Sequence, residues 1–534
     1  MTKRNVRTRK RRHTDTSQPA VTVDVDQTVD YVTRPFFVIS LASLFLLFFG
    51  ALATVLISVA TPQEPLVADD PSYTHSESLK LQQLLHHTSA NGWRVADRRE
   101  REELDATRCN IERRDANSVT VDEFESLYRF KKPLLLTFPN GAADWTDPDL
   151  FQRRKLLDLY SYWSVSSGRS LDIVKSGGAG EIQASFGEYV EEMMNERDEI
   201  SDEPFYIFDR HFFQDSELQH SFHPPHLLAN INEEGTDSFF FMGASRSGVS
   251  FHKHADAWNA VVLGRKRWFL YPPNKTPPGG VWPGYSQIDW LKNIYPTLEG
   301  NDKPLECVQE AGEILYLPES YYHGTINIGD TLAIGLQKVE ASTPAEQLVY
   351  DLNQLNVKVL NTEDRNIQND VQKQIVEKYY QLYTLLPNSA EICHKLGEAL
   401  YDDGQYDKGL EFLQKAIDYD PKFVVAYSTL SRYLKQLDDI TGSEAAIRKA
   451  YKLNPHNFDV VIQYAELTEA NGDLDTAASL YEHGIRIKPE DHLYFKLSVI
   501  LKSLGEHEQA VQMYRKGQLL KEEQLLVQQQ YETM

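Results

Sequence analysis

The stretch FHKHADAWNAVVLGRKRWFLYPP, residues 251–273, decides the fold of this chain. Its first part places His252, His254 and Asp256 at every second position. Successive side chains of a β-strand point to opposite faces, so these three share one face if the strand stays extended. Imidazoles and a carboxylate gathered on one face are candidate metal ligands. The sequence therefore predicts a metal site at the start of a β-rich run.

A second motif, GEILYLPESYYHGTIN, supplies the remaining candidate ligand. The spacing of Gly312, Pro318 and His323 resembles the second motif of cupins, with Ser320 where glycine is usual. In such barrels the distal histidine meets the first pair across the mouth. Two histidines and a carboxylate with open positions form the ligand set of non-haem Fe(II) oxygenases. We therefore expect His323 to complete the site.

The two motifs together resemble the jumonji-C (JmjC) family over about residues 107–340, including CNIERRDANSVTVDEFESLY, PFYIFDRHFFQDSEL and DWLKNIYPTL. The resemblance implies a double-stranded β-helix, and active family members are Fe(II)- and 2-oxoglutarate-dependent protein hydroxylases or demethylases. It implies that Lys266 pairs with the distal carboxylate of 2-oxoglutarate and that Asn259 and Asn327 line the cofactor pocket. Gly335 stands where active relatives have a hydroxyl residue.

Two registers of ligands are open. The family's spacing between the first ligand and the cofactor lysine is matched better by His252, 14 residues before Lys266, than by His254, 12 residues before it. The first register gives an all-histidine site of His252, His254 and His323. The second makes Asp256 the alternative ligand, beside His254 and His323. Three neutral imidazoles suit zinc, copper or iron, so another divalent metal could replace Fe(II).

A membrane anchor is predicted near the N-terminus. No charged residue occurs from Pro35 to Ala60, and about 20 apolar residues cross a bilayer as a helix. A basic head precedes this span and acidic residues follow it, so the N-terminus is predicted to be cytosolic. We expect a single-pass type II protein of the endoplasmic reticulum or secretory pathway, with its C-terminal domains in the lumen. The alternative is a signal peptide cleaved after Ala60.

The last third of the chain carries an internal repeat. Four prolines are spaced by 34 residues, which is the period of the tetratricopeptide repeat: Pro387, Pro421, Pro455 and Pro489. Small residues recur where paired helices must pack closely: Gly397, Ser431, Ala465 and Ser498, then Gly409, Ser443, Ala477 and Ala510. We predict four repeats that bind a protein or peptide partner on their concave face. The alternative is a spacer or dimerisation arm.

These features predict a multidomain α+β chain: a transmembrane helix, a cupin-like JmjC barrel and an all-α tetratricopeptide-repeat solenoid. We predict a basic tail at residues 1–34, a transmembrane helix at 35–60 and a stalk at 61–105. The JmjC domain follows at 106–345 and a helical connector at 346–387. The four repeats take up 388–523, and a C-terminal tail takes up 524–534. Three cysteines allow one disulfide in an oxidising lumen. Cys109 and Cys307 are the expected pair, because Cys393 falls in another domain.

Two functions follow from these predictions. In the first, the chain is a lumenal protein hydroxylase that uses Fe(II) and 2-oxoglutarate, and its repeats recruit a polypeptide substrate. In the second, it is a membrane-anchored adaptor with a barrel that has lost turnover. A net charge of −23 argues against nucleic acid as a partner. A lumenal domain would not meet chromatin, which disfavours histone demethylation.

Overall fold

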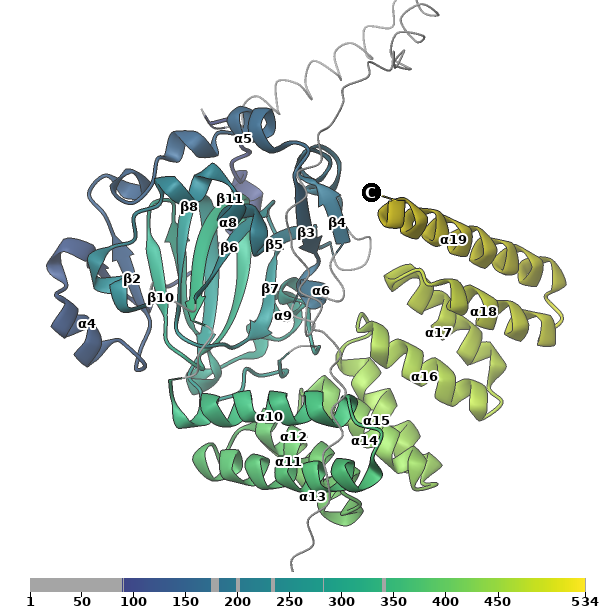
Figure 1. The fold of residues 1–534 in the computed structure, drawn as a ribbon. Helices are drawn as coiled ribbons and strands as arrows, with labels where there is room; N and C mark the ends of the chain where they lie inside the picture. Colours follow the sequence, from purple (N-terminus) through teal and green to yellow (C-terminus); the bar gives the residue numbers. More distant parts are fainter. Residues whose placement is uncertain are drawn as a thin grey trace, which may run out of the picture. The chain divides into compact units, whose positions relative to one another are not determined.

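The computed structural model describes residues 89, 91–173, 182–197, 202–231, 236–281, 283–338 and 342–533 (Figure 1). The predicted basic tail, membrane span and first part of the stalk lie outside these residues. Within the described ranges, no helix combines the length and apolar character needed to cross a membrane. All described residues belong to a compact unit that begins at Glu77.

Eleven strands of this unit form one hydrogen-bonded network. They are β1 (Glu112–Asp115), β2 (Leu134–Thr137), β3 (Ser164–Gly168), β4 (Ile182–Ser185), β5 (Tyr206–Asp209), β6 (Thr236–Gly243), β7 (Gly248–His252), β8 (Ala257–Tyr271), β9 (Leu305–Glu310), β10 (Ile314–Leu317) and β11 (Tyr322–Lys338). In one half of the network β9, β8, β11 and β7 lie side by side. In the other half the neighbours are β10, β8, β11 and β6. The two long strands β8 and β11 therefore run through both halves (Figure 1).

The long strands bend together at one place. Their register shifts between Ile328 and Leu332, opposite Gly264. Gly264 and Gly329 both have positive φ, at 79° and 76°. A Cβ on Gly264 would lie 2.3 Å from the carbonyl oxygen of Asp330, so only glycine fits there. The bend folds one ladder into two facing sheets, which is the double-stranded β-helix predicted from the sequence.

Short helices surround the strands: α3 (Arg98–Leu104), α4 (Val121–Leu127), α5 (Arg153–Tyr160), α6 (Ser170–Ile173), α7 (Phe186–Glu188), α8 (His211–Asp215) and α9 (Gln287–Asn293). The largest apolar cluster of the barrel packs side chains of β6, β8 and β11 against α5 and α8. Phe240 and Ala260 are fully buried within this cluster, and Ile334 is 1% exposed. These strands thus form the walls of the core.

The end of the predicted stalk is part of the fold, which corrects the predicted boundary at residue 105. Trp93 is 2% exposed and donates from its indole to the carbonyl of Phe151, at 2.8 Å. The backbone of Arg94 donates to Asp330 at 2.8 Å. Leu104 on α3 is fully buried. The segment was predicted to be a stalk because most of its residues are polar or charged, although its few apolar residues pack on the barrel.

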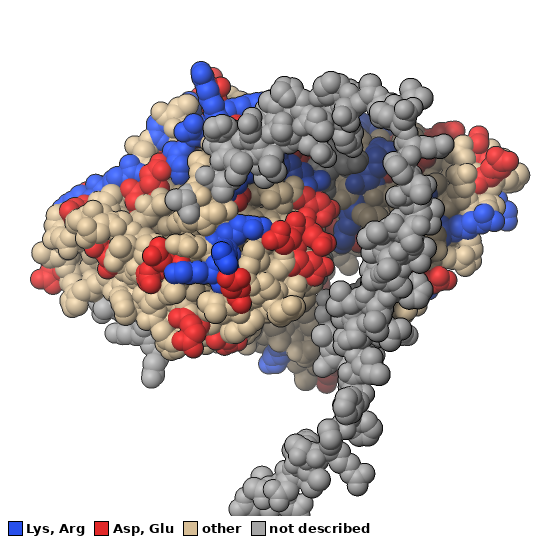
Figure 2. Space-filling view, turned by 90° about the horizontal axis from the view of Figure 1, so that it is seen from above, with Lys and Arg blue, Asp and Glu red and all other residues tan. Residues whose placement is uncertain are grey.

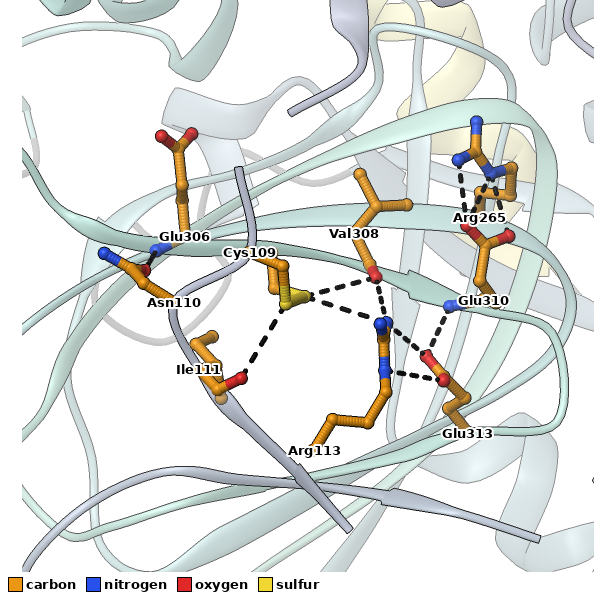
Figure 3. Close-up of a disulfide and its surroundings, with 10 residues drawn as sticks. Cys109, Asn110, Ile111, Arg113, Arg265, Glu306, Val308, Glu310 and Glu313 are labelled. Atoms are coloured by element: carbon orange, nitrogen blue, oxygen red, sulfur yellow. Dashed lines mark hydrogen bonds and ion pairs between the residues drawn. A yellow bond between two sulfur atoms is a disulfide. The ribbon is translucent and has the colours of Figure 1, made fainter. Parts of the chain in front are cut away.

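The predicted disulfide is confirmed. Cys109 is bonded to Cys307 on β9, and it ties the segment before β1 to the barrel. Figure 3 shows the Arg113 guanidinium beside this bridge, where it donates to the carbonyl of Val308 at 3.0 Å and pairs with Glu313 at 3.0 Å. Cys393 is a buried free thiol.

The helical part consists of antiparallel pairs (Figure 1). The predicted connector is the pair α10 (Pro344–Leu360) and α11 (Arg365–Leu385). The predicted repeats are α12 (Ala390–Asp402) with α13 (Tyr406–Tyr419), α14 (Val424–Gln436) with α15 (Ile440–Leu453), α16 (Phe458–Ala470) with α17 (Leu474–Ile487), and α18 (Asp491–Ser503) with α19 (His507–Thr533). The last helix continues through the segment predicted as a C-terminal tail.

The small residues of the repeats lie at the helix contacts, as predicted. A Cβ on Gly397 would lie 2.9 Å from the carbonyl oxygen of Gly409. One repeat later the same place is taken by Ser431 and Ser443, whose hydroxyl oxygens are 3.0 Å apart. Each helix pair therefore approaches closely because neither partner has a large side chain at the crossing.

One face of the described residues has mixed charge (Figure 2). On the face seen in Figure 2, acidic and basic side chains are interspersed over the described residues. Nucleic-acid-binding proteins instead gather lysine and arginine along one face. The described residues on this face thus carry charge of both signs (Figure 2).

Candidate metal centre

The three predicted histidine ligands come together at one end of the barrel. His252 is the last residue of β7, and His323, the second residue of β11, pairs with it directly in the ladder. His254 lies two residues further on, before β8 begins. One ring nitrogen from each residue lies within 4.8 Å of the others. Pairing of β7 with β11 thus brings together residues that are about 70 positions apart in the sequence.

Backbone hydrogen bonds fix the tautomer of all three rings. The Nδ1 atoms of His252, His254 and His323 lie 2.8, 2.8 and 2.9 Å from backbone carbonyl oxygens. A carbonyl has no proton to give, so each Nδ1 carries the hydrogen and each neutral Nε2 keeps its lone pair. A metal-ligating histidine usually donates its other ring N–H to such an acceptor, which fixes the orientation of the ring. The cluster therefore presents three prepared nitrogen donors.

Burial keeps these rings neutral. It lowers the pKa of His252 to about 4. Burial, with repulsion from His252, lowers the pKa of His254 to about 3. The same two effects, with repulsion from His254 added, hold the pKa of His323 well below its ordinary value. Metal binding requires neutral imidazole, so no proton has to be displaced near pH 7.

Asp256, the alternative ligand, lies outside the cluster. It is fully buried, and its carboxylate accepts from the Tyr316 hydroxyl at 2.6 Å and from Nε of Arg129 at 3.1 Å. The chain leaves the strand after His252 and bends before β8 starts at Ala257, so the alternation assumed for an extended strand stops short of Asp256. The three histidines of the first register thus lie together among the described residues, and the ligand set itself stays a prediction.

A pocket opens from the histidines into the barrel, and Lys266 of β8 lies in it. Lys266 is 2% exposed, and its Nζ donates to the Tyr206 hydroxyl at 3.0 Å. The ammonium also lies 4.9 Å from the ring centre of Phe241 and 5.7 Å from that of Trp268. Burial lowers its pKa to about 7. Burial is the only cause of this shift, with no contribution from a charged partner among the described residues, so the pocket favours an anionic ligand.

The two predicted asparagines differ in their placement. Asn259 lines the pocket, and its buried Oδ1 has no hydrogen-bond partner among the described residues. Such an atom calls for a donor from a ligand or water. Asn327 lies opposite Lys266 in the ladder but does not line the pocket. Its Nδ2 donates instead to the hydroxyl of Ser247 at 3.0 Å.

Gly335 lines the pocket, at the position where the family resemblance implies a hydroxyl residue in active relatives. A Cβ there would lie 2.6 Å from Cε2 of Phe241, so the phenyl ring occupies the space of a larger residue. Sequence reasoning did not single out Tyr206 or Phe241. Alternation along PFYIFD and SFFFMG was the available signal, since every second residue of a barrel strand faces inward.

Comparison with known proteins supports this description. A family model of the cupin-like domain matches residues 165–334, and tetratricopeptide-repeat models match residues 390–423, 424–457 and 492–524. The connection between a cupin-like barrel and C-terminal repeats is therefore shown by two independent sets of matches.

Three curated relatives match parts of this chain. JmjC domain-containing protein 8 of Mus musculus is 34% identical over 240 residues, 43% of this chain and 82% of that protein. The bifunctional arginine demethylase and lysyl-hydroxylase psr-1 of Caenorhabditis elegans is 26% identical, over 46% of this chain and 64% of that protein. A 2-oxoglutarate and iron-dependent oxygenase of Gallus gallus is 33% identical over 109 residues, 18% of this chain and 25% of that protein. The similarity to the first of these, over most of its length, shows that the chain belongs to the JmjC-domain family.

Proposed function

We propose that this chain is a membrane-anchored, lumenal 2-oxoglutarate-dependent protein hydroxylase whose repeats recruit a polypeptide substrate. One observation carries the proposal: three neutral histidines with free Nε2 atoms adjoin a pocket that holds the ammonium of Lys266. The histidines suit a metal ion and the ammonium suits an anion. A metal ion beside an anion pocket is what a 2-oxo acid cosubstrate requires.

The residues fit both cofactors. His252, His254 and His323 would hold Fe(II), and Lys266 with the Tyr206 hydroxyl would hold the far carboxylate of 2-oxoglutarate. When bound, the metal supplies the activation of dioxygen that hydroxylation needs. The protein residues fix the ligand geometry and shield the pocket from water. With no carboxylate in the ligand set, the site would carry one more positive charge than a two-histidine, one-carboxylate site, and other divalent metals compete for it.

The repeats supply a place for a polypeptide. A polar groove borders α10, α11, α12 and α14, and its lining includes Tyr379, Lys395, Glu398 and Arg432. Lys395 and Arg432 both pair with Glu398, at 3.0 and 3.3 Å, yet each keeps about half of its side chain exposed. Exposed donors and acceptors in one groove can bind the backbone and charged side chains of an extended peptide.

A lumenal location is supported by the disulfide between Cys109 and Cys307, because such bridges persist in oxidising compartments. It is also supported by the apolar span from Pro35 to Ala60, with its basic N-terminal flank. Protease treatment of intact microsomes should remove only the short N-terminal tail. Digestion of the repeats in sealed vesicles would contradict the orientation.

A second function has specific support. His254 stands where iron oxygenases of this type carry a carboxylate, and Phe241 fills the space beside Gly335. Both features favour an adaptor that has kept the pocket but lost turnover. In that case the repeats bind the partner, and the barrel serves as a ligand-binding or structural domain.

One experiment separates the two functions. Full-length chain is analysed for bound metal and for conversion of 2-oxoglutarate to succinate, with His323→Ala as the metal-free control and His254→Asp as the test variant. Turnover in the wild type supports the hydroxylase. Turnover only in His254→Asp, which restores a carboxylate ligand, supports the adaptor. A wild type that binds no metal shows that the histidines are structural and rules out the hydroxylase.

A further inference from the structure

One carboxylate from the repeats holds both chain segments that carry the histidines. Lys253 lies between His252 and His254, and its Nζ is 2.8 Å from Oε2 of Glu391. Tyr322 immediately precedes His323, and its hydroxyl donates to the same oxygen at 2.5 Å. Lys253 and Tyr322 are also 3.1 Å apart, so the three groups form a closed triangle.

Glu391 belongs to the first repeat and not to the barrel. It is the second residue of α12, after the N-cap Ser389. Its backbone N–H donates to the hydroxyl of Thr276, which also contacts the Ser389 hydroxyl at 3.1 Å. The Lys253 and Glu391 side chains are only 15% and 17% exposed. Removing one member of such a poorly hydrated pair leaves the other charge unmatched, so the contact strongly prefers to stay intact.

A second connection leads from the same site to the connector. Ser320 has φ of 67°, a conformation that favours glycine, and it stands where the cupin motif has glycine. Its N–H donates to the carbonyl of His254 at 2.9 Å, and its hydroxyl donates to Glu346 on α10. A strained serine at this position is explained by the bond to Glu346, which glycine could not make. The segment that carries His252 and His254 and the segment just before His323 are therefore both bonded to helices outside the barrel.

We propose that Glu391 is a positioning residue of the three-histidine centre and that the first repeat is a structural part of that centre. This inference rests on the proposed function only in taking the histidines as metal ligands. Docking of α12 holds the Lys253 and Tyr322 side chains, and these restrain the backbone on either side of the three imidazoles. Linkage is reciprocal, so a bound metal also strengthens the docking of the first repeat on the barrel.

The test measures metal affinity in the full-length chain. Fe(II) or Co(II) is titrated against a competing chelator in the wild type, Glu391→Ala, Glu391→Gln and the control Glu469→Gln. Glu469 is a partly buried repeat carboxylate that accepts from the Tyr481 hydroxyl at 2.6 Å without touching the barrel. We expect Glu391→Ala to weaken metal binding about tenfold, the lower end for residues that orient ligands. Glu391→Gln should weaken it less, and Glu469→Gln should not change it.

A combined variant separates positioning from general destabilisation. If Glu391 acts through Lys253 and Tyr322, then adding Glu391→Gln to Lys253→Met with Tyr322→Phe should weaken metal binding no further. Hydrogen exchange of the segment around His252 and His254 should be faster in Glu391→Gln than in the wild type. If Glu391→Ala does not fold, Glu391→Gln, which keeps the shape of the side chain, decides the question.

The outcomes are distinguishable from those of the proposed function. Metal affinity within twofold of the wild type in folded Glu391→Ala, or in Glu391→Gln if Glu391→Ala does not fold, overturns this inference and leaves the hydroxylase proposal intact. Weakened affinity in these variants, beside a wild type that binds metal without turnover, supports this inference while overturning the hydroxylase. A wild type without metal affinity overturns both. Equal weakening in Glu469→Gln would show a general effect of the repeats and overturn the role of Glu391.

Discussion

Asp256→Ala and His323→Ala should differ in their effect on metal binding, and this contrast tests the assignment of the site. Asp256 is fully buried and is bonded to Tyr316 and Arg129, away from the histidine cluster. His323 is 3% exposed and lies in the cluster. We therefore expect Asp256 to contribute to stability and His323 to contribute to metal binding.

The cost of Asp256→Ala can be worked out from the hydrogen bonds of its carboxylate. The substitution removes two hydrogen bonds to a charged group, each worth about 1.5–3 kcal/mol. The cost is limited because Arg129 keeps its ion pair with Glu125 at 2.9 Å and the Tyr316 hydroxyl still accepts from the N–H of Phe130 at 2.9 Å. It is limited further because burial disfavours the ionised carboxylate and raises the pKa of Asp256. We expect a net destabilisation of about 3 kcal/mol with unchanged metal content.

His323→Ala removes one of three ligands and one hydrogen bond to the carbonyl of Tyr321, at 2.9 Å. We expect loss of tight metal binding and a decrease of about 1 kcal/mol in the stability of the metal-free chain. Urea unfolding of the apo proteins measures stability, and elemental analysis after dialysis measures metal. If Asp256→Ala loses the metal while His252→Ala retains it, the ligand set is His254, Asp256 and His323, and the assignment is refuted.

Three further predictions concern the cofactor pocket, the repeats and the disulfide. The pKa of Lys266, lowered to about 7 from its ordinary 10.5, implies that 2-oxoglutarate affinity, measured by calorimetry, falls above about pH 7. Between about pH 7 and 10.5 the unfolded chain binds more protons at this lysine than the native chain does, so its contribution to the free energy of unfolding should rise with pH over that range. Lys266→Met should abolish the pH dependence of both the affinity and the stability. Ala416→Asp places an unpaired charge at a fully buried helix contact, which should cost several kcal/mol of stability. Circular dichroism should therefore show loss of helix, and metal affinity should fall as well. The control Ala470→Asp, at an exposed position, should change neither quantity. Replacing Cys109 and Cys307 by alanine opens a loop closed across 198 residues and should lower the free energy of unfolding by up to about 5 kcal/mol; an unchanged denaturation midpoint would contradict this.

The sequence by itself determined the features that repeat or alternate locally. The 34-residue spacing of prolines predicted the repeats, because each helix pair needs the same small residues at its crossing. The spacing of Gly312, Pro318 and His323 predicted the turn and strand that bring His323 to the mouth of the barrel. The pairing of Cys109 with Cys307 followed from the separation of domains, and the structure confirms it.

Only the tertiary structure decided which groups face one another. Strand alternation left Asp256 and His252 as competing ligands, because it could not show that β7 ends at His252 and that the chain bends before β8. The Tyr206 partner of Lys266 and the closing of space beside Gly335 by Phe241 depend on strands paired across the barrel. The link from Lys253 to Glu391 joins residues 138 positions apart and depends on the docking of α12. Such contacts carry no local signal, since neither residue's neighbours in the sequence reveal what lies opposite.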